Sequence, residues 1–242
     1  NWWIIAFGIL FTFMVLMANL APTLLFPLFY KFTPLENASL KEKLTKLSEE
    51  NGVKVNGIFE MDMSKNTKKA NAALAGIGNT KRIILSDTLL KDFTEEEIET
   101  IIAHELGHKN YNHIFKLMGV QTILMFLVFY LSNVVLNSYY ASFGFRGIDD
   151  IAALPLLLIT LTLVSLISMP IANSLSRFFE VQADTFALKT TQNAKSFISA
   201  MERLAAINLA EKEPNAIKEF IFYSHPSIAK RVALANSFSK KL

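Results

Sequence analysis

The chain has 242 residues, of which 52% are hydrophobic, and it carries a net charge of +3 and no cysteine. The apolar share exceeds the roughly 45–50% usual for a soluble domain, and the excess lies in three runs, which indicates membrane-spanning helices. The lack of cysteine excludes disulfides and thiolate metal sites. The weak net charge, without basic runs interleaved with aromatics, gives no support for nucleic-acid binding.

The three apolar runs predict transmembrane helices over residues 1–30, 117–136 and 151–172, because about 20 apolar residues suffice to cross a bilayer. Pro22 and Pro27 should break or kink the end of the first helix. In the third run, Pro155 fits the first turn of a helix and Pro170 fits its end. Residues 137–150 form a short loop on the opposite side of the membrane from the remaining segments.

Residues 31–116 and 173–242 are the water-facing segments. In the first, leucines at helical spacing predict an amphipathic helix over 40–51 that stops at Gly52. Strands over 53–63, 71–76 and 81–85 predict a small mixed sheet, with a turn at 78–80 and a helical turn from Ser86. In the second, helices are expected over 174–189 and 196–212, and from Ser224-His225-Pro226, with the proline at the first helical position.

His104-Glu105-Leu106-Gly107-His108 reads H-E-x-x-H. On a helix the two histidines lie one above the other on one face, so both can bind one metal ion while Glu105 acts as general base. Thr94 and Glu97 form a capping box that predicts the start of this helix. The helix runs to about Lys116, and the lack of a clear stop signal leaves open one long helix into the second apolar run. His113 would then lie on the opposite face and is not counted as a ligand.

The hairpin of the second and third runs returns residues 173–242 to the side of the membrane that carries the H-E-x-x-H helix. There, Glu180 and Asp184 share one helix face. A catalytic zinc site takes three protein ligands, and two histidines with one glutamate are a known set. We therefore expect one Zn²⁺ per chain, held by His104, His108 and Glu180, with Asp184 accepting the other ring N–H of a ligand histidine. The alternative is a solvated acidic face beside Arg177.

These motifs together resemble the integral-membrane CAAX prenyl proteases of the zinc-metallopeptidase type. The matching stretches cover nearly the whole chain: His104-Glu105-Leu106-Gly107-His108, Phe179-Glu180-x-x-Ala183-Asp184, Phe32-Thr33-Pro34-Leu35, Asn71-Ala72-x-x-x-Gly76, the segment from Lys81 to Leu90, and His225-Pro226 with Arg231. The resemblance implies a mostly α, multi-spanning membrane protein that combines a gluzincin-like zinc metallopeptidase domain with a small β-sheet.

The resemblance also implies roles for further residues. Asn71 would lie on an edge strand that holds an extended peptide by backbone pairing. His225 and Arg231 would be catalytic residues that face the scissile carbonyl or the polar end of the substrate. From the residues alone, a turn, an N-cap and a solvated helix face explain these three positions as well.

The implied activity is zinc-dependent endopeptidase cleavage of a peptide or protein substrate, prenylated or not, beside the lipid bilayer. The alternatives are a quality-control zinc protease of the heat-shock type and an inactive membrane scaffold. Lysine and arginine next to the predicted spans place the active site on the cytoplasmic side of a multi-pass protein of the bacterial inner membrane or the endoplasmic reticulum. Family members carry further spans before the matching stretch, and this chain begins at Asn1, so we expect either a C-terminal portion or a minimal relative.

Overall fold

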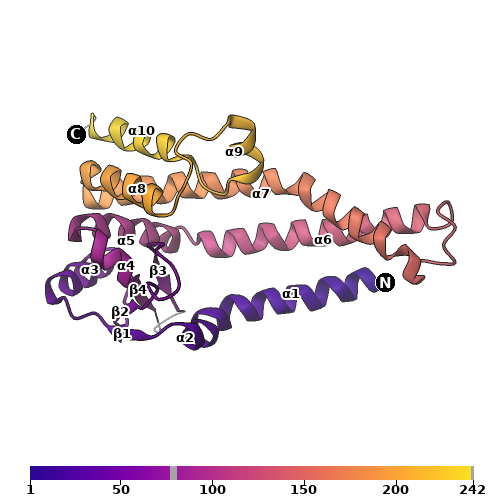
Figure 1. The fold of residues 1–242 in the computed structure, drawn as a ribbon, viewed down its shortest axis with the longest axis horizontal. Coiled ribbons are helices and arrows are strands. Elements are labelled where there is room, and N and C mark those ends of the chain that lie inside the picture. Colours follow the sequence, from indigo (N-terminus) through magenta and orange to yellow (C-terminus); the bar gives the residue numbers. More distant parts are fainter. Residues whose placement is uncertain (77–80, 241–242) are drawn as a thin grey trace.

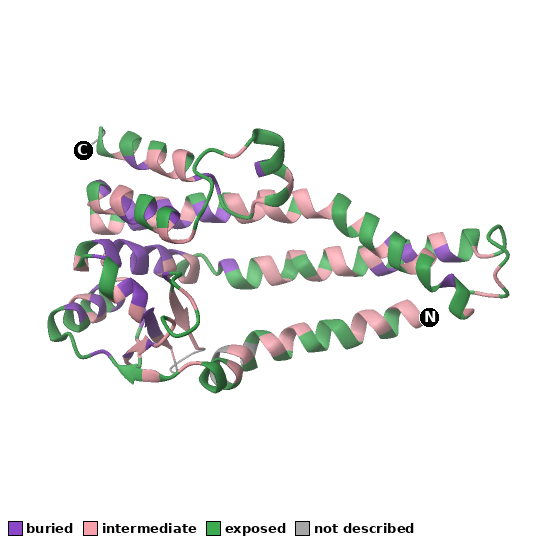
Figure 2. Cartoon of the chain, viewed as in Figure 1, coloured by how far each residue is buried: buried purple, intermediate pink, exposed green. Residues whose placement is uncertain are grey.

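The computed structural model describes residues 1–76 and 81–240, which form a compact helix-and-sheet part and three long helices extending from it (Figure 1). The long helices α1 (Trp2–Leu20), α6 (His113–Tyr139) and α7 (Leu154–Thr191) run side by side. Buried residues concentrate in the compact part, whereas the long helices expose much of their surface (Figure 2). By length and composition, the helical segments 113–139 and 151–191 are apolar enough to cross a membrane, and 2–18 is a shorter apolar helix. The predicted mostly α class with a small mixed sheet is confirmed.

The prolines of the apolar runs affect their helices differently. After α1 the chain remains helical through a π-helical stretch (Ala21–Leu25) and α2 (Phe26–Phe29), so the expected disruption takes the form of one wide turn. Pro155 lies in the first turn of α7 as predicted, but Pro170 lies inside that helix and does not end it. The missing proline N–H removes one backbone hydrogen bond, and packing of α7 on α5 and α6 keeps the helix continuous to Thr191.

The H-E-x-x-H motif lies on α5 (Glu95–Asn110), which begins with the predicted capping box of Thr94 and Glu97. The alternative of one long helix into the second apolar run is wrong. The chain breaks at Tyr111 and Asn112, where Asn112 has a left-handed φ of 55°, and α6 starts at His113. Asparagine adopts this conformation more readily than most residues. Because the helix is broken, the placement of His113 on the face opposite the motif is also wrong.

The sheet has the strand order β1-β2-β4-β3 and lies beside α5 in the compact part. Its strands are β1 (Phe32–Pro34), β2 (Ile58–Met61), β3 (Ala72–Ala75) and β4 (Arg82–Ser86), with β2 and β4 parallel and the other pairs antiparallel. β1 was not predicted, because three residues ending in proline carry almost no strand pattern. The turn predicted at 78–80 lies outside the described residues. The order leaves β3 at an edge of the sheet.

Helices cover the rest of the compact part. α3 (Ala38–Glu50) ends just before Gly52, whose φ is 72°, and α4 (Asp87–Asp92) is capped by Ser86, both close to expectation. α8 (Ala194–Ile207) is shorter than predicted, and α9 (Ala216–Phe222) was missed. α10 (Ile228–Ser239) begins after Ser227, whose side chain accepts from the Lys230 N–H, and not at Pro226. The hydroxyl cap therefore leaves His225 in a loop.

One hydrophobic core joins these elements and holds α5 in place. Its fully buried side chains come from α3, the sheet, α4, α5, α7 and α8, and include Leu44, Ile83, Leu85, Leu89, Leu106, Leu188 and Phe197. Each such side chain contributes roughly 1.5–3 kcal/mol when it is fully buried. Because α5 contributes several buried side chains to this core, packing holds the helix with the two histidines in place.

The arrangement of α6 and α7 predicts a labelling pattern. Ser142, in the loop between them, and Ser64, between β2 and β3, are exposed. The loop after α6 and the sheet lie toward opposite ends of the long helices (Figure 1). We expect an impermeant thiol reagent to label Ser142→Cys and Ser64→Cys from opposite sides of the membrane. The parent chain has no cysteine and serves as the blank. Labelling of both positions from the same side would contradict the hairpin.

Candidate metal centre

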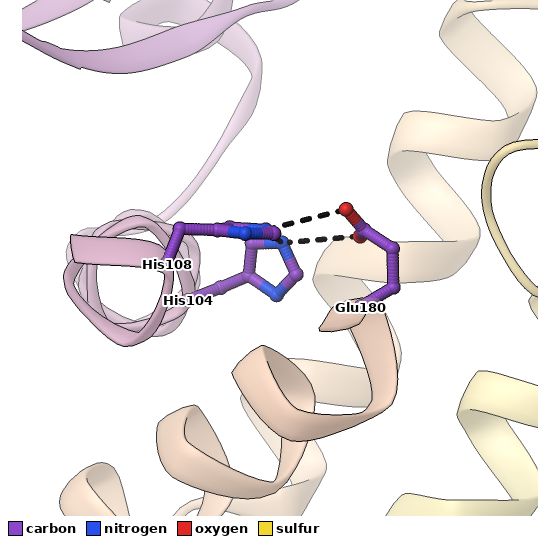
Figure 3. A group of neighbouring side chains, drawn as sticks. All are labelled: His104, His108 and Glu180. Atoms are coloured by element: carbon purple, nitrogen blue, oxygen red, sulfur yellow. Dashed lines mark hydrogen bonds and ion pairs between the residues drawn. The ribbon is translucent and has the colours of Figure 1, made fainter. Parts of the chain in front are cut away.

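Two helices far apart in sequence build the site by packing closely against each other. α5 carries His104 and His108 one turn apart, and α7 carries Glu180 on the turn that faces them (Figure 3). Gly107 makes this approach possible, because a Cβ on it would lie 3.0 Å from the Ala183 Cα and 3.1 Å from the Phe186 Cβ. The motif glycine is therefore a packing requirement of the site.

The three predicted ligands point toward one another. The His104 Nε2 lies 3.3 Å from Glu180 Oε2, and the His108 Nε2 lies 3.2 Å from Glu180 Oε1 (Figure 3). The two Nε2 atoms are 3.0 Å apart, and one ligand atom from each residue falls within 4.8 Å of the others. Two imidazoles and one carboxylate form a donor set that suits zinc and leaves a position open.

The electrostatics of this group fit a bound cation. Glu180 Oε2 is buried and finds no hydrogen-bond partner among the described residues. Burial opposes ionisation of Glu180, but its contacts with His104 and His108 hold its pKa well below the usual range. Burial lowers the pKa of His104, but its hydrogen bond to Asp184 and its close contact with Glu180 outweigh this and raise it to about 9. The site thus attracts positive charge, and protons compete with a metal ion for it.

Asp184 lies directly behind His104, where it was predicted. Its Oδ1 is 2.8 Å from the His104 Nδ1, which places the proton on Nδ1 and leaves the Nε2 lone pair for a metal. Arg231, on α10, binds both oxygens of Asp184, with an Nε–Oδ2 distance of 2.8 Å. Burial raises the pKa of Asp184, but the charge of Arg231 outweighs it and keeps the carboxyl ionised. Arg231 therefore binds the carboxylate that supports His104, and its guanidinium comes within 3.4 Å of the His104 Nδ1.

Glu105 follows the first ligand and is half-buried beside the group. Burial raises the pKa of its carboxyl above the usual range, an effect that the nearby His104 and His108 oppose. A carboxylate with a raised pKa holds a proton more readily near neutral pH, which suits a group that must both accept and release one.

The remaining predicted residues lie around this centre. His225, in the loop before α10, is exposed, with its Nε2 3.5 Å from Glu180 Oε1 and its Nδ1 2.9 Å from the Ser224 hydroxyl. The surrounding protein displaces part of the water around this exposed ring, which lowers the pKa of His225 and favours the neutral imidazole. Asn71 is exposed just before the edge strand β3, and its backbone is bound to Ser86 on β4. β3 in turn lies against α5.

His113 is the residue at the centre that the sequence analysis missed. Its side chain is fully buried, and its Nδ1 lies 3.0 Å from the Nδ1 of His108. Helical spacing places it away from the motif, so only recognition of Asn112 as a break in the helix could have located it.

Three comparisons relate the chain to known proteins. A family model described as "Peptidase family M48" matches residues 34–238. The "Uncharacterized metalloprotease YhfN" of Bacillus subtilis is 30% identical over 96% of this chain and 55% of its own length. A "CAAX prenyl protease 1 homolog" of Oryza sativa subsp. japonica is 36% identical over 97% of this chain and 56% of its own. The chain thus spans about half the length of these relatives.

A solved structure extends the similarity to the fold. The crystal structure of S. mikatae Ste24p superposes with a TM-score of 0.85 at 30% identity, covering 98% of this chain and 59% of that one. At this coverage nearly every element of the chain has a counterpart in that structure. The compact part and the long helices therefore follow an arrangement already seen by experiment.

Gly107→Ala tests the close approach of α5 and α7. The added methyl meets backbone atoms of Ala183, so the helices must separate, and we expect a loss of about 1–3 kcal/mol in stability. The melting temperature and the zinc affinity should both fall. Gly119→Ala, on α6 with nothing within 4 Å of the added methyl, is the matched control and should leave both unchanged or raise stability slightly. Equal behaviour of the two variants would contradict the packing argument.

Proposed function

The chain belongs to peptidase family M48, and from that premise we propose that it is a membrane-associated zinc endopeptidase resembling the CAAX prenyl proteases. The observation that carries this proposal is the convergence of His104, His108 and Glu180 from two helices, with Glu105 beside them. The inactive scaffold that the sequence left open gains no support, because no member of this group is replaced.

Each residue of the centre has a distinct task in peptide hydrolysis. His104, His108 and Glu180 would hold the zinc ion, which supplies a Lewis acid for the scissile carbonyl and the attacking water. The Glu105 carboxylate takes one proton from that water as its oxygen attacks the carbonyl carbon. It then passes the proton to the amide nitrogen as the C–N bond breaks, so that an acid and an amine leave. The half-buried position of Glu105 next to His104 supports both transfers.

The substrate peptide would lie along β3. This strand is at the sheet edge, adjoins α5 and has alanine at three of its four positions, so an extended peptide could pair with the side on which the described residues place no further strand. Asn71, at its start, would fix the end of the peptide. The exposed His225 would contact the substrate near the scissile bond, since its ring lies at Glu180. Arg231 would act through Asp184, which it binds.

The active site would face the cytoplasm in a multi-pass protein. Lys31, Lys109, Lys116 and Arg177 flank the apolar helices on the side of the compact part, whereas the loop at 140–150 has Arg146 against Asp149 and Asp150. Positive charge is enriched on the cytoplasmic side of membrane helices. Labelling of the Ser64→Cys and Ser142→Cys variants in intact cells also tests this orientation.

The lipid bilayer and a prenylated protein are the proposed partners. The Oryza sativa relative is named as a homolog of CAAX prenyl protease 1, which points to prenylated proteins as substrates. The long helices beside the site expose apolar side chains. Burial of a lipid tail among such side chains would contribute about 0.8 kcal/mol per CH₂ group.

Glu105→Gln tests the chemistry. The substitution keeps the size of the side chain and removes the base, so zinc should remain bound while turnover falls by about 10²- to 10⁴-fold. Zinc content by atomic absorption and peptide cleavage give the two readouts. Glu180→Ala is the contrasting variant and should lose the metal, whereas Glu202→Ala, exposed on α8, should change neither readout. Turnover of Glu105→Gln within a few-fold of the parent would remove Glu105 from its role.

Paired peptides test the substrate. A farnesylated C-terminal peptide should be cleaved with a much higher kcat/KM than its unlipidated twin by the full-length protein in detergent, because the apolar helices can receive the lipid. A quality-control protease would instead show little dependence on the lipid and would readily cleave an unfolded membrane protein. Equal kcat/KM values for the two peptides would favour that alternative.

A further inference from the structure

His108 forms a second histidine pair with His113, on the side of its ring away from Glu180. The helix is broken at Asn112, and α6 continues from the end of α5 in nearly the same direction (Figure 1), with the ring of its first residue placed against His108. His113 Nδ1 lies 3.0 Å from His108 Nδ1, and His113 Nε2 lies 3.0 Å from the Gln182 Oε1 on α7. The ring is fully buried and stacks on Phe179, with centroids 4.6 Å apart and an interplanar angle of 15°.

When both rings are neutral, the hydrogen bonds that link His108, His113 and Gln182 allow only one arrangement of protons. An amide oxygen can only accept, so His113 Nε2 carries the proton that Gln182 Oε1 receives. A neutral His113 then has a bare Nδ1, which can only accept from His108. His108 therefore carries its proton on Nδ1, and its Nε2 keeps a free lone pair. That Nε2 is the atom that faces Glu180 at 3.2 Å.

We propose that His113 and Gln182 form a relay that fixes His108 in the tautomer able to bind metal. Both are positioning residues, because neither belongs to the group of atoms that would hold the ion. If the Gln182 amide were reversed, each proton would shift along the relay and one would occupy the His108 Nε2, which would then be unable to bind a metal ion. The inference rests on the proposed zinc function and adds two residues to the machinery of that site.

The two ligand histidines are thus supported in different ways. His104 is backed by the carboxylate of Asp184, which Arg231 binds, whereas His108 is backed by a neutral imidazole and an amide. A carboxylate behind each histidine would put a third buried negative charge beside Glu180 and Asp184. The neutral relay sets the tautomer of His108 without adding that charge, and stacking on Phe179 restrains the His113 ring.

The test measures zinc affinity and not activity, by chelator competition at one fixed pH on the full-length protein. His113→Phe keeps the stacking on Phe179 and removes the acceptor, so zinc should bind about 10- to 100-fold more weakly, the usual effect of losing such a partner. His113→Asn places an amide oxygen near the former Nδ1 and should recover most of the affinity. A purely structural role for His113 predicts the reverse order, because phenylalanine fills the space better than asparagine.

Gln182 provides the same test from another helix, should His113→Phe fail to fold. Gln182→Leu should weaken zinc binding as His113→Phe does, whereas Gln182→Glu, which can only accept, should match or exceed the parent. Gln121→Leu, exposed on α6, is the matched control and should leave the affinity unchanged. Equal zinc affinity for Gln182→Leu and Gln182→Glu would overturn the relay while leaving the proposed function intact. Absence of zinc binding by the parent protein would instead overturn the proposed function.

Discussion

The close packing of α5 on α7 is the constraint on which the rest of the structure depends. One helix carries two of the proposed metal ligands and the other carries the third, so a displacement of about an ångström between them would take the ligand atoms out of reach of one ion. Gly107 allows the backbones to approach, and packing in the hydrophobic core holds α5 in place. The same contact joins the compact part to the long apolar helices, because α7 belongs to both.

Buried charge is the second organising feature. Glu180 and Asp184 lie one turn apart on α7, and two buried carboxylates this close are tolerated only when each has a partner. Arg231 neutralises Asp184 from α10, while Glu180 faces the ring nitrogens of the two histidines. The C-terminal helix thereby contributes to the centre electrostatically from the far end of the chain. A metal ion at the histidines would balance the remaining carboxylate.

The motifs, the apolar runs and much of the local structure follow from the sequence. Periodicity and caps predicted α3, α4, the start of α5 and two of the strands nearly to the residue, because those signals act within a few positions of each other. H-E-x-x-H predicted two ligands on one helix face, since the effect of a four-residue spacing is a property of a single helix. The hairpin argument added Glu180 and Asp184, since a loop between two long helices returns the chain to its starting side.

The tertiary structure alone decided how separate helices meet. The hydrophobic periodicity does not show whether the helix continues through Asn112 or breaks there. The contact between His113 and His108 could therefore not be predicted. The same holds for Pro170, which packing keeps inside α7, and for Arg231, which from the residues alone is part of a solvated helix face and which the structure places against Asp184. Sequence spacing determines which residues share one helix face. Which faces come together depends on the packing of the whole core, and that is not a local property of the chain.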